Sequence, residues 1–326
     1  MINNYYQFDS QFRKNIGSLI LGIDEAGRGP LAGPVVAVGV IMPPTWQNSE
    51  IKDSKKLSEP KRNELFDIIQ KNALKVIVEI SWENEIDKLN ILGATIECFK
   101  RILGKIYPKP EIILIDGNPV PINHYDIHYI KKGDSKSLSI ASASIIAKVT
   151  RDRIMLQMDL VFPEYGFKNH KGYGTKNHME AIKKYGSLPI HRRTFKPVLQ
   201  FLSLVGKLNN RSLGILGAKC AAVSLIKSGF EIVEMNYLKS KIGEIDIIHI
   251  ENGELVFSEV KTIYNPSDLD NPASRITQKK VEKLMNVSCM YLDEKGFVGN
   301  IRFDVISVRF FGNNPHISRI KSGITL

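Results

Sequence analysis

The chain has 326 residues, of which 43% are hydrophobic and 24% are charged. This length corresponds to about two domains of ~150 residues each, and the balance is that of globular proteins, which excludes collagen, a coiled coil and wholesale disorder. The longest uncharged apolar run, residues 31–42, has 12 residues, whereas a membrane-spanning helix needs roughly 20. The first residues lack the basic start and apolar middle of a signal peptide. We therefore expect a cytoplasmic protein without a membrane span.

The basic residues are concentrated in one stretch of the chain. Lys and Arg number 45 and Asp and Glu 34, which gives a net charge of +11. Residues 1–204 hold 29 basic and 21 acidic residues (+8), and residues 205–326 hold 16 and 13 (+3). Within the first part, residues 131–196 alone hold 14 basic and 5 acidic residues (+9). This concentration is typical of a polyanion-binding surface; the alternative is a solvated basic face that only aids solubility.

Hydrophobic patterning predicts alternating strands and helices in the first 200 residues. The predicted strands cover residues 18–26, 34–42, 73–80, 111–115 and 124–130. One predicted helix opens at Ser58, others cover 83–106, 135–161 and 178–185, and residues 165–175 are expected to form a basic loop. The first two strands, separated by a glycine-rich turn, are expected to pair as a hairpin. The whole pattern is typical of a mixed α/β sheet covered by helices.

A second, smaller α/β domain is predicted after a boundary near residue 205, which divides the chain into domains 1–205 and 206–326. The expected helices of this domain cover 214–228 and 278–287, and the expected strands cover 244–249, 254–261 and 301–308. The first two of these strands flank a short Glu-Asn-Gly turn, which predicts a hairpin.

Carboxylates lie where the predicted strands of the first domain end. Asp24 and Glu25 end the first strand, Asp116 ends the strand 111–115, and Asp134 precedes the long helix. Burying an ionised carboxylate costs several kcal/mol unless a cation or hydrogen bonds compensate. Hard oxygen ligands without sulfur suit Mg²⁺ or Mn²⁺. Two such ions ~4 Å apart would activate water and stabilise the leaving oxygen of a phosphodiester.

Each acid also has a purely structural explanation. Asp134 could cap the helix, and Asp116 could be a turn residue before glycine. Neighbouring residues on a regular strand point to opposite faces. Asp24 and Glu25 can therefore share one site only if the strand bends at residues 27–29, or if Glu25 contributes its backbone carbonyl.

The motifs GIDEAGRGPLAGPVVAVGVI, DSKKLSEPKR, ILIDG, KKGDSKSLSIASASIIAKVTRDR, FPEYGFKNHKGYGTKNH and IHRRTFKPV follow one another along residues 18–200. In this order they resemble the bacterial ribonuclease HII family. The resemblance implies an RNase H-like fold and metal-dependent endonucleolytic cleavage 5′ of a ribonucleotide, in RNA/DNA hybrids or in duplex DNA. The products would carry a 3′-hydroxyl and a 5′-phosphate. It also implies a part in ribonucleotide excision repair and DNA replication.

The resemblance also implies roles for single residues. The family's metal-binding acids fall on Asp24, Glu25, Asp116 and Asp134. Its ribose-sensing loop falls on Gly27, Arg28 and Gly29, where glycines let the backbone approach the 2′-hydroxyl that distinguishes RNA from DNA. Its tyrosine at the RNA-to-DNA junction falls on Tyr173. From their charge and position, phosphate contacts are expected from Lys55, Lys56, Lys148, Arg151 and Arg153, and simple surface residues are the alternative.

The second domain contains a weaker acidic pattern. Asp246 is followed after twelve residues by Glu259 and then Lys261. On paired strands the two acids can lie side by side as metal ligands, and Lys261 would face the same side as Glu259 and position a water. A pattern this short arises often by chance, and an exposed Glu/Lys pair on a strand is the alternative.

Residues 211–310 resemble the YraN-like family, on the motifs GAKCAAVSLIKSGFEIVEMNY, GEIDII, LVFSEVK and RFDVISV. This resemblance implies a restriction-endonuclease-like core. The family usually has Gly-Glu in its first helix, whereas this chain has Gly217-Ala218, so one carboxylate is missing. The second domain is therefore expected to be either a DNA nuclease or a degenerate nucleic-acid-binding module.

Two other readings of the whole chain stay open. One is a non-catalytic DNA-binding repair scaffold that uses the basic residues 131–196; salt-sensitive binding without cleavage would favour it. The other is a nucleotidyl-transfer enzyme, because such enzymes share both the fold and the carboxylate arrangement.

Overall fold

The computed structural model describes residues 4–122, 126–201, 205–266 and 277–323. They fall into two compact units, which are described separately. The first unit comprises residues 1–155, 171–175 and 190–200, and the second comprises 156–170, 176–189 and 201–326. The predicted boundary near residue 205 stays a prediction. None of the described helices is both long enough and apolar enough to cross a membrane.

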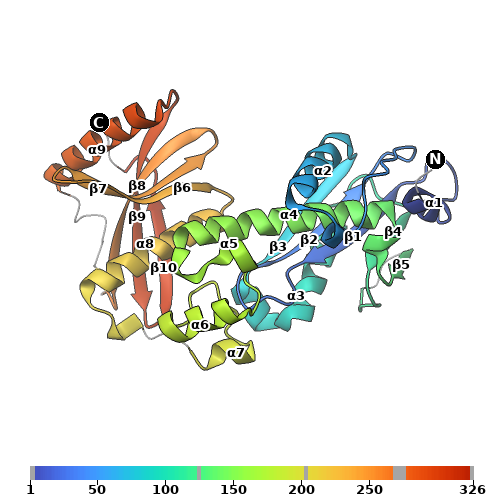
Figure 1. Cartoon of the computed structure of the whole chain (residues 1–326), viewed down its shortest axis with the longest axis horizontal. Coiled ribbons are helices and arrows are strands. Elements are labelled where there is room, and N and C mark those ends of the chain that lie inside the picture. The colour runs from blue at the N-terminus through green and yellow to red at the C-terminus, as the bar shows by residue number, and fades with distance from the viewer. Residues whose placement is uncertain (1–3, 123–125, 202–204, 267–276, 324–326) are drawn as a thin grey trace. The chain divides into compact units, whose positions relative to one another are not determined.

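The first unit is built on a five-stranded mixed sheet in the order β3-β2-β1-β4-β5 (Figure 1). The strands are β1 (Ile20–Ala26), β2 (Val35–Ile41), β3 (Lys75–Ser81), β4 (Ile112–Asp116) and β5 (Ile127–Ile130). β1, β2 and β3 pair antiparallel, whereas β4 is parallel to β1 and β5 is parallel to β4. The predicted mixed sheet and the predicted hairpin of its first two strands are confirmed.

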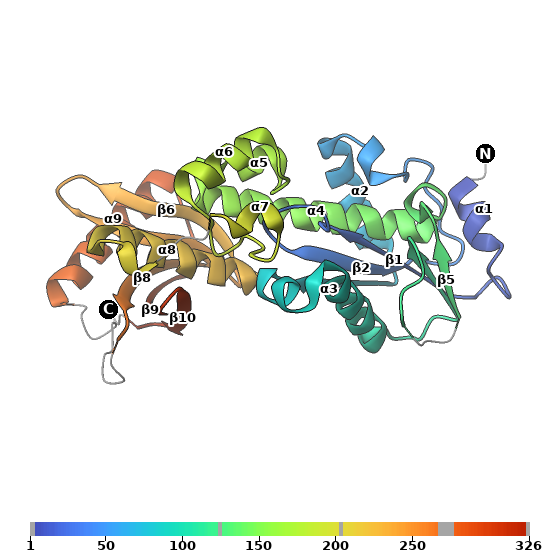
Figure 2. The same ribbon diagram turned by 90° about the horizontal axis from the view of Figure 1, so that it is seen from below.

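Both faces of this sheet are buried under helices, because apolar residues occupy both sides of β2. Val36, Val38 and Val40 pack with residues of α2 (Glu59–Asn72) and α4 (Leu138–Val161). Ala37 and Ile41 pack instead with residues of α3 (Glu83–Lys105), which lies over the other face (Figure 2). The first unit also contains the short helices α1 (Asn4–Ser10) and α7 (Lys196–Leu199) and the single turns η1 (Ser54–Lys56) and η2 (Gly133–Ser135). The short helices α5 (Phe167–His170) and α6 (Lys176–Tyr185) and the turns η3 (Pro163–Tyr165) and η4 (Val205–Lys207) belong to the second unit.

Several boundaries differ from the predicted ones. The long helix begins at Leu138 and not at residue 135, because residues 133–135 form the separate turn η2. α3 is interrupted at Asn90, which has a φ of 56°. The expected loop at 165–175 holds the short helix α5. The first residues of the predicted strand 124–130 lie outside the described part of the chain.

The second unit contains another five-stranded sheet, in the order β10-β9-β8-β7-β6. Its strands are β6 (Glu231–Lys239), β7 (Gly243–Glu251), β8 (Glu254–Tyr264), β9 (Ile301–Phe311) and β10 (Asn314–Ile320). The predicted hairpin of β7 and β8 is antiparallel, and β8 and β9 are parallel. Helices α8 (Asn210–Lys227) and α9 (Gln278–Lys295) pack against this sheet (Figure 1). The smaller α/β architecture is confirmed.

The sequence pattern missed both edge strands of the second sheet. β6 contains a register shift between Ile232 and Glu234, which breaks its alternation. β10 has a proline and alternates between exposed and half-buried residues. Edge strands of this kind carry a weak hydrophobic signal, because only one neighbour and one face cover them.

Candidate active site

The acids of the first unit meet at the ends of two neighbouring parallel strands. Asp24 and Glu25 lie near the end of β1, and Asp116 is the last residue of β4. Ile23 pairs with Ile115 in the parallel ladder, so Asp24 and Asp116 follow the same rung. The hydrophobic strands thus carry these carboxylates to one edge of the sheet, as the sequence predicts.

Asp24 is the most deeply buried of these acids, with 5% of its surface exposed. Its pKa is raised well above the ordinary value, by burial first and then by the negative charges of Glu25 and Asp116. Its Oδ1 accepts a hydrogen bond of 2.7 Å from the Glu25 N–H. The protein provides Asp24 with hydrogen bonds but with too little positive charge to offset its burial.

The neighbouring carboxylates are in a similar state. Burial raises the pKa of Glu25 against the opposing effect of Arg28, whose Nη1 lies 3.4 Å from Glu25 Oε1. Burial also raises the pKa of Asp116, against a hydrogen bond of 2.6 Å from the Gly133 N–H. Three adjacent acids that all favour protonation form a site of excess negative charge.

Asp134 joins this site from the turn η2, four residues after Ile130, the last residue of β5. It is buried, with 6% of its surface exposed, and its Oδ2 lies 3.2 Å from Nζ of Lys55. Lys55 and Lys56 lie in η1, and both are exposed. The fold thus places Lys55 against the acids, whereas Lys56 forms no ion pair with them within the described chain.

Asp24 and Glu25 remain on a regular strand. They pair with Val38 and Ala37 in an unbroken antiparallel register that continues through Ala26, and the turn begins only at Gly27, which has a φ of 102°. Among the described residues, the side chains whose ligand atoms all lie within 4.8 Å of one another are in the second unit. The acids at the ends of β1 and β4 do not form such a group.

The glycine-rich loop and Tyr173 lie together in the first unit. A Cβ added to Gly29 would lie 3.5 Å from the ring of Tyr173. The tyrosine is 46% exposed, and the Arg151 guanidinium lies 6.0 Å from the centre of its ring. The structure therefore brings together the two elements that the resemblance connects with the sugar.

Arg151 does not contact phosphate, and this expectation is wrong. It is 1% exposed, and its guanidinium donates hydrogen bonds to the backbone carbonyls of Pro34, Ala32 and Lys171. Lys148 forms an ion pair of 2.7 Å with Asp152, and Arg153 lies over the Phe66 ring at 4.3 Å. Charge and helix position alone could not distinguish a buried arginine from exposed ones.

Arg192 has a role that the sequence reasoning missed. It is 0% exposed and donates hydrogen bonds to the carbonyls of Gly27, Arg28 and Gly33. The motif IHRRTFKPV contains this arginine beside Arg193, but no local signal indicates which of the two points inward.

The acidic pattern of the second unit also assembles. Asp246 on β7 accepts a hydrogen bond of 2.6 Å from the Val260 N–H on β8. Glu259 is 2% exposed, and its oxygens lie 2.7 Å from Nζ of Lys261 and 3.0 Å from Nζ of Lys280 on α9. Burial and the charge of Glu259 raise the pKa of Asp246 to about 7. The sequence reasoning missed Lys280, because α9 is distant in the chain.

Position 218 lies on the helix α8. Ala218 is buried, and its neighbour Gly217 lies so close to β8 that an added Cβ would meet Thr262 Oγ1 at 1.8 Å. The glycine therefore has a packing role.

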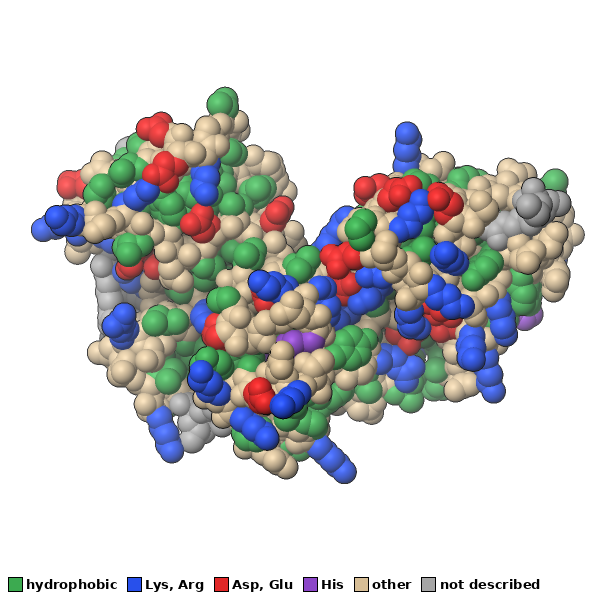
Figure 3. Space-filling view, viewed as in Figure 1, with side chains coloured by type: hydrophobic (Ala, Val, Ile, Leu, Met, Phe, Trp, Pro, Cys, Tyr) green, Lys and Arg blue, Asp and Glu red, His purple; other side chains and the backbone are tan. Residues whose placement is uncertain are grey.

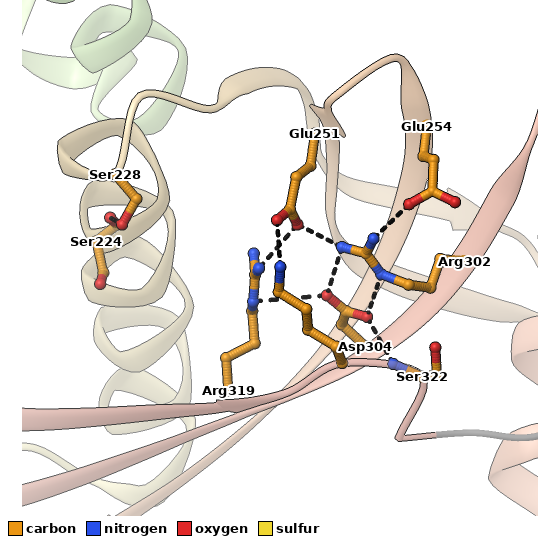
Figure 4. A network of polar contacts seen from close by, with 9 residues as sticks. Ser224, Ser228, Glu251, Glu254, Arg302, Asp304, Arg319 and Ser322 are labelled. Atoms are coloured by element: carbon orange, nitrogen blue, oxygen red, sulfur yellow. Dashed lines mark hydrogen bonds and ion pairs between the residues drawn. The ribbon is translucent and has the colours of Figure 1, made fainter.

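A second acidic group of the same unit is already neutralised by cations. The ligand atoms of His249, Glu251 and Asp304 lie within 4.8 Å of one another. Figure 4 shows the Arg302 guanidinium between the carboxylates of Glu251 and Asp304, with Arg319 beside them. Against the opposing effect of burial, hydrogen bonds from Lys321 and Arg302 and the charge of Arg319 lower the pKa of Glu251 to about 2. A divalent ion would have to displace them, so this network is structural.

Lys and Arg side chains are scattered over the face shown in Figure 3 and are not confined to one spot. Acidic side chains lie among the basic ones in several places on this face.

Comparison with known proteins assigns the two parts of the chain. The family model of ribonuclease HII matches residues 21–198, and the model of "Uncharacterised protein family UPF0102" matches residues 217–308. Ribonuclease HII of Geotalea daltonii is 51% identical over 193 residues, which cover 59% of this chain and 89% of that protein. Ribonuclease HII of Clostridioides difficile is 55% identical over 174 residues, which cover 53% of this chain and 68% of that protein.

Among solved structures, ribonuclease H2 from Pyrococcus horikoshii is 29% identical, with a TM-score of 0.49, and the match covers 56% of this chain and 96% of that one. On the family model and the relatives, the chain belongs to the ribonuclease HII family. Its first part is a ribonuclease H enzyme of type HII, and its second part is a YraN-family domain fused behind it.

Proposed function

We propose that the first unit is a metal-dependent endonuclease. It hydrolyses the phosphodiester on the 5′ side of a ribonucleotide, in RNA/DNA hybrids and in duplex DNA with embedded ribonucleotides, and leaves a 3′-hydroxyl and a 5′-phosphate. The observation that carries this proposal is the group of adjacent carboxylates formed by the buried Asp24 and the half-buried Glu25 and Asp116, whose pKa values are all raised. Such a group favours a bound cation over its own ionised state. A cytoplasmic location goes with this proposal and stays a prediction.

Asp24, Glu25, Asp116 and Asp134 would hold Mg²⁺ or Mn²⁺. Their hard oxygens and their unbalanced negative charge fit these ions, and sulfur ligands are absent from this described set. When bound, two such ions would activate a water and stabilise the leaving oxygen. Within the protein, the Gly133 N–H orients the Asp116 carboxylate, and Lys55 holds Asp134 by its 3.2 Å ion pair.

The substrate would be bound by the loop and the tyrosine beside these acids. Gly27, Arg28 and Gly29 would contact the ribose, and Tyr173 would pack on the sugar of the following deoxynucleotide. The proximity of Gly29 to the Tyr173 ring supports this arrangement. The exposed Lys55 and Lys56 would contact phosphates.

The test is cleavage of an end-labelled DNA duplex that carries one ribonucleotide, in Mg²⁺, in Mn²⁺ and in EDTA. The intact chain should cut just 5′ of the ribonucleotide, whereas Asp24→Asn should lose about 10³-fold or more of the rate. Asp67→Asn, which removes an exposed carboxylate on α2, is the matched control and should cut normally. Salt-sensitive binding without cutting in either metal would support a repair scaffold instead, and strand-joined products would support nucleotidyl transfer.

For the second unit we propose a nucleic-acid-processing module centred on Asp246, Glu259 and Lys261. The buried acid pair supports a DNA nuclease, whereas Lys280, which already neutralises Glu259, favours a module that only binds nucleic acid. Metal-dependent cutting of ribonucleotide-free DNA that is lost in Glu259→Ala would establish the nuclease. Unchanged binding and no cutting in both proteins would establish the binding module.

A further inference from the structure

Two buried arginines lie under the glycine-rich loop of the first unit. Arg192 and Arg151 are 0% and 1% exposed, and neither forms an ion pair with a carboxylate within the described chain. Burial and the charge of Arg151 lower the pKa of Arg192 to about 9. The charges of Asp87 and Glu83 near Arg192, and of Asp152 near Arg151, offset only part of the cost of burying two like charges side by side. This cost indicates that the arrangement serves more than packing.

The hydrogen-bond partners of these two guanidinium groups are backbone carbonyls, and all of them except that of Lys171 belong to residues 27–34. Arg192 binds the carbonyls of Gly27 at 2.5 Å, Arg28 at 2.8 Å and Gly33 at 3.0 Å. Arg151 binds those of Ala32 at 3.1 Å and Pro34 at 3.0 Å. The rigid planar fork of arginine spreads its donors over three nitrogens, so it reaches acceptors that the single ammonium nitrogen of lysine cannot reach together. The loop is therefore fixed through its carbonyl groups.

Fixing a carbonyl also fixes the N–H of the same peptide group. The peptide bonds after Gly27 and after Arg28 are trans, since the cis bond of the described chain is at Pro108. In a trans peptide the C=O and the following N–H point in opposite directions. Because the Gly27 and Arg28 carbonyls point at Arg192, the N–H groups of Arg28 and Gly29 point away from it.

These two N–H groups lie at the exposed part of the loop. Arg28 and Gly29 are exposed, whereas Gly27 and residues 30–34 are buried. Neither N–H donates to a backbone carbonyl in the described chain, although Leu31 and Gly33 both do. Successive N–H groups that point the same way form a concave site for an oxygen acceptor. The buried positive charge behind them strengthens this preference.

The glycines at both ends of this arrangement are needed for the close approach. A Cβ on Gly27 would lie 2.2 Å from Nε of Arg151, and one on Gly172 would lie 2.5 Å from the Ala32 carbonyl. Both glycines have positive φ values, of 102° and 86°. Side chains at these two positions would therefore push the backbone away from Arg151 and from the Ala32 carbonyl that Arg151 binds.

We propose that Arg192, supported by Arg151, is a positioning residue that turns the N–H groups of Arg28 and Gly29 toward the nucleic acid, where they bind a hydroxyl or phosphate oxygen. This inference rests on the proposed function for the identity of the substrate. Arg192 itself does not touch the reacting atoms.

The experiment follows the amide signals of Arg28 and Gly29 in the ¹⁵N-labelled full chain, with EDTA present, so that no cleavage is needed. On titration with a duplex that carries one ribonucleotide, both signals should shift in the wild-type protein and in the control Arg193→Gln. Arg193 is the exposed neighbour of Arg192, so the control removes the same charge outside the loop. Shifts with an all-DNA duplex as well would identify a phosphate oxygen, and shifts with the ribonucleotide duplex alone would identify a hydroxyl.

In Arg192→Gln and Arg192→Lys the shifts should be lost. With Mg²⁺, both variants should also lose about 10²-fold in kcat, the effect of a small misplacement of substrate-positioning groups, with KM changed less than about threefold. Arg192→Lys keeps the charge and guards against a glutamine variant that fails to fold. The inference is overturned if the wild-type signals do not move at saturating duplex, or if a folded Arg192→Lys protein keeps the wild-type shifts and rate. A wild-type protein that shows the shifts but never cuts would refute only the proposed function.

Discussion

At the scale of single residues, Asp24 shows that a carboxylate suited to bind a cation lowers the stability of the folded protein when no cation is bound. Its carboxylate is buried between two other acids, which raises its pKa. Because the folded state favours the protonated form, the destabilising effect of Asp24 is smallest at low pH and grows as pH rises through the folded pKa. Function and stability are therefore opposed at this residue.

We predict that Asp24→Asn stabilises the metal-free protein at neutral pH by about 1 kcal/mol while it abolishes cleavage. The substitution removes the charge but keeps the shape. Trp46 and Trp82 both lie in the first unit, so urea unfolding followed by tryptophan fluorescence reports on this unit alone. Mg²⁺ should stabilise the wild-type protein more than the variant. A metal-free variant less stable than wild type would contradict this account.

His249 gives a second prediction, of opposite sign in pH. The residue is 0% exposed, and burial lowers its pKa from 6.5 to about 4. A histidine that is neutral in the folded state and protonates more readily when unfolded contributes full stability above pH 6.5, which is lost as pH falls toward 4. At pH 5 this loss amounts to about 2 kcal/mol relative to pH 7.

His249→Leu should remove this pH dependence. The cost of the change in shape is the same at both pH values, so it drops out when the difference between pH 7 and pH 5 is compared. The measurement is urea unfolding followed by far-UV circular dichroism, with tryptophan fluorescence to separate the first unit. Equal losses of stability in wild type and variant between pH 7 and pH 5 would rule out a role for His249.

At the scale of elements, the start of α4 lies directly against β1. A Cβ on Gly22 would lie 2.2 Å from the backbone carbon of Ser139. The N–H of Ser139 in turn donates 2.8 Å to the buried Asp9 of α1, which supplies an acceptor for the helix N-terminus. This close contact places α4, with Ser144, beside the acid at the end of β1.

Gly22→Ala should therefore destabilise the first unit by about 3 kcal/mol or more, because backbone atoms cannot move aside as a flexible side chain can. Gly104→Ala is the matched control. This glycine lies in α3 with no atom within 4 Å of an added Cβ, so the change should stabilise by about 0.5–1 kcal/mol. Urea midpoints by tryptophan fluorescence compare the two. A Gly22→Ala protein as stable as wild type would contradict the contact.

At the scale of the whole molecule, the net charge of +11 governs how duplexes bind. Each neutralised phosphate releases counterions, so affinity falls linearly with the logarithm of salt concentration. With about four phosphate contacts, affinity for the duplex should fall about 10²-fold between 50 and 200 mM salt. Fluorescence anisotropy in EDTA measures this slope, and Lys55→Gln should reduce it by about one phosphate. A slope near zero would exclude phosphate contacts as the main source of affinity.

The sequence by itself determined which strands carry the acids and to which family the chain belongs. Hydrophobic runs that end in Asp24 and Asp116 are local signals, and the sheet edge at which they meet follows from parallel pairing. The paired strands that hold Asp246 and Glu259 were predictable from another local signal, because a short turn between two strands indicates an antiparallel hairpin. Local patterning was enough wherever burial on both faces of a strand gave a continuous apolar run.

Only the tertiary structure decided the direction of the side chains that connect distant segments. Arg192 reaches carbonyls 159 to 165 residues earlier in the chain, and Lys280 reaches Glu259 from another helix. A buried arginine and an exposed one have the same local signal, because its long side chain can point either way. Which carbonyls or carboxylates it meets depends on contacts between segments far apart in sequence, and those contacts exist only once the chain has folded.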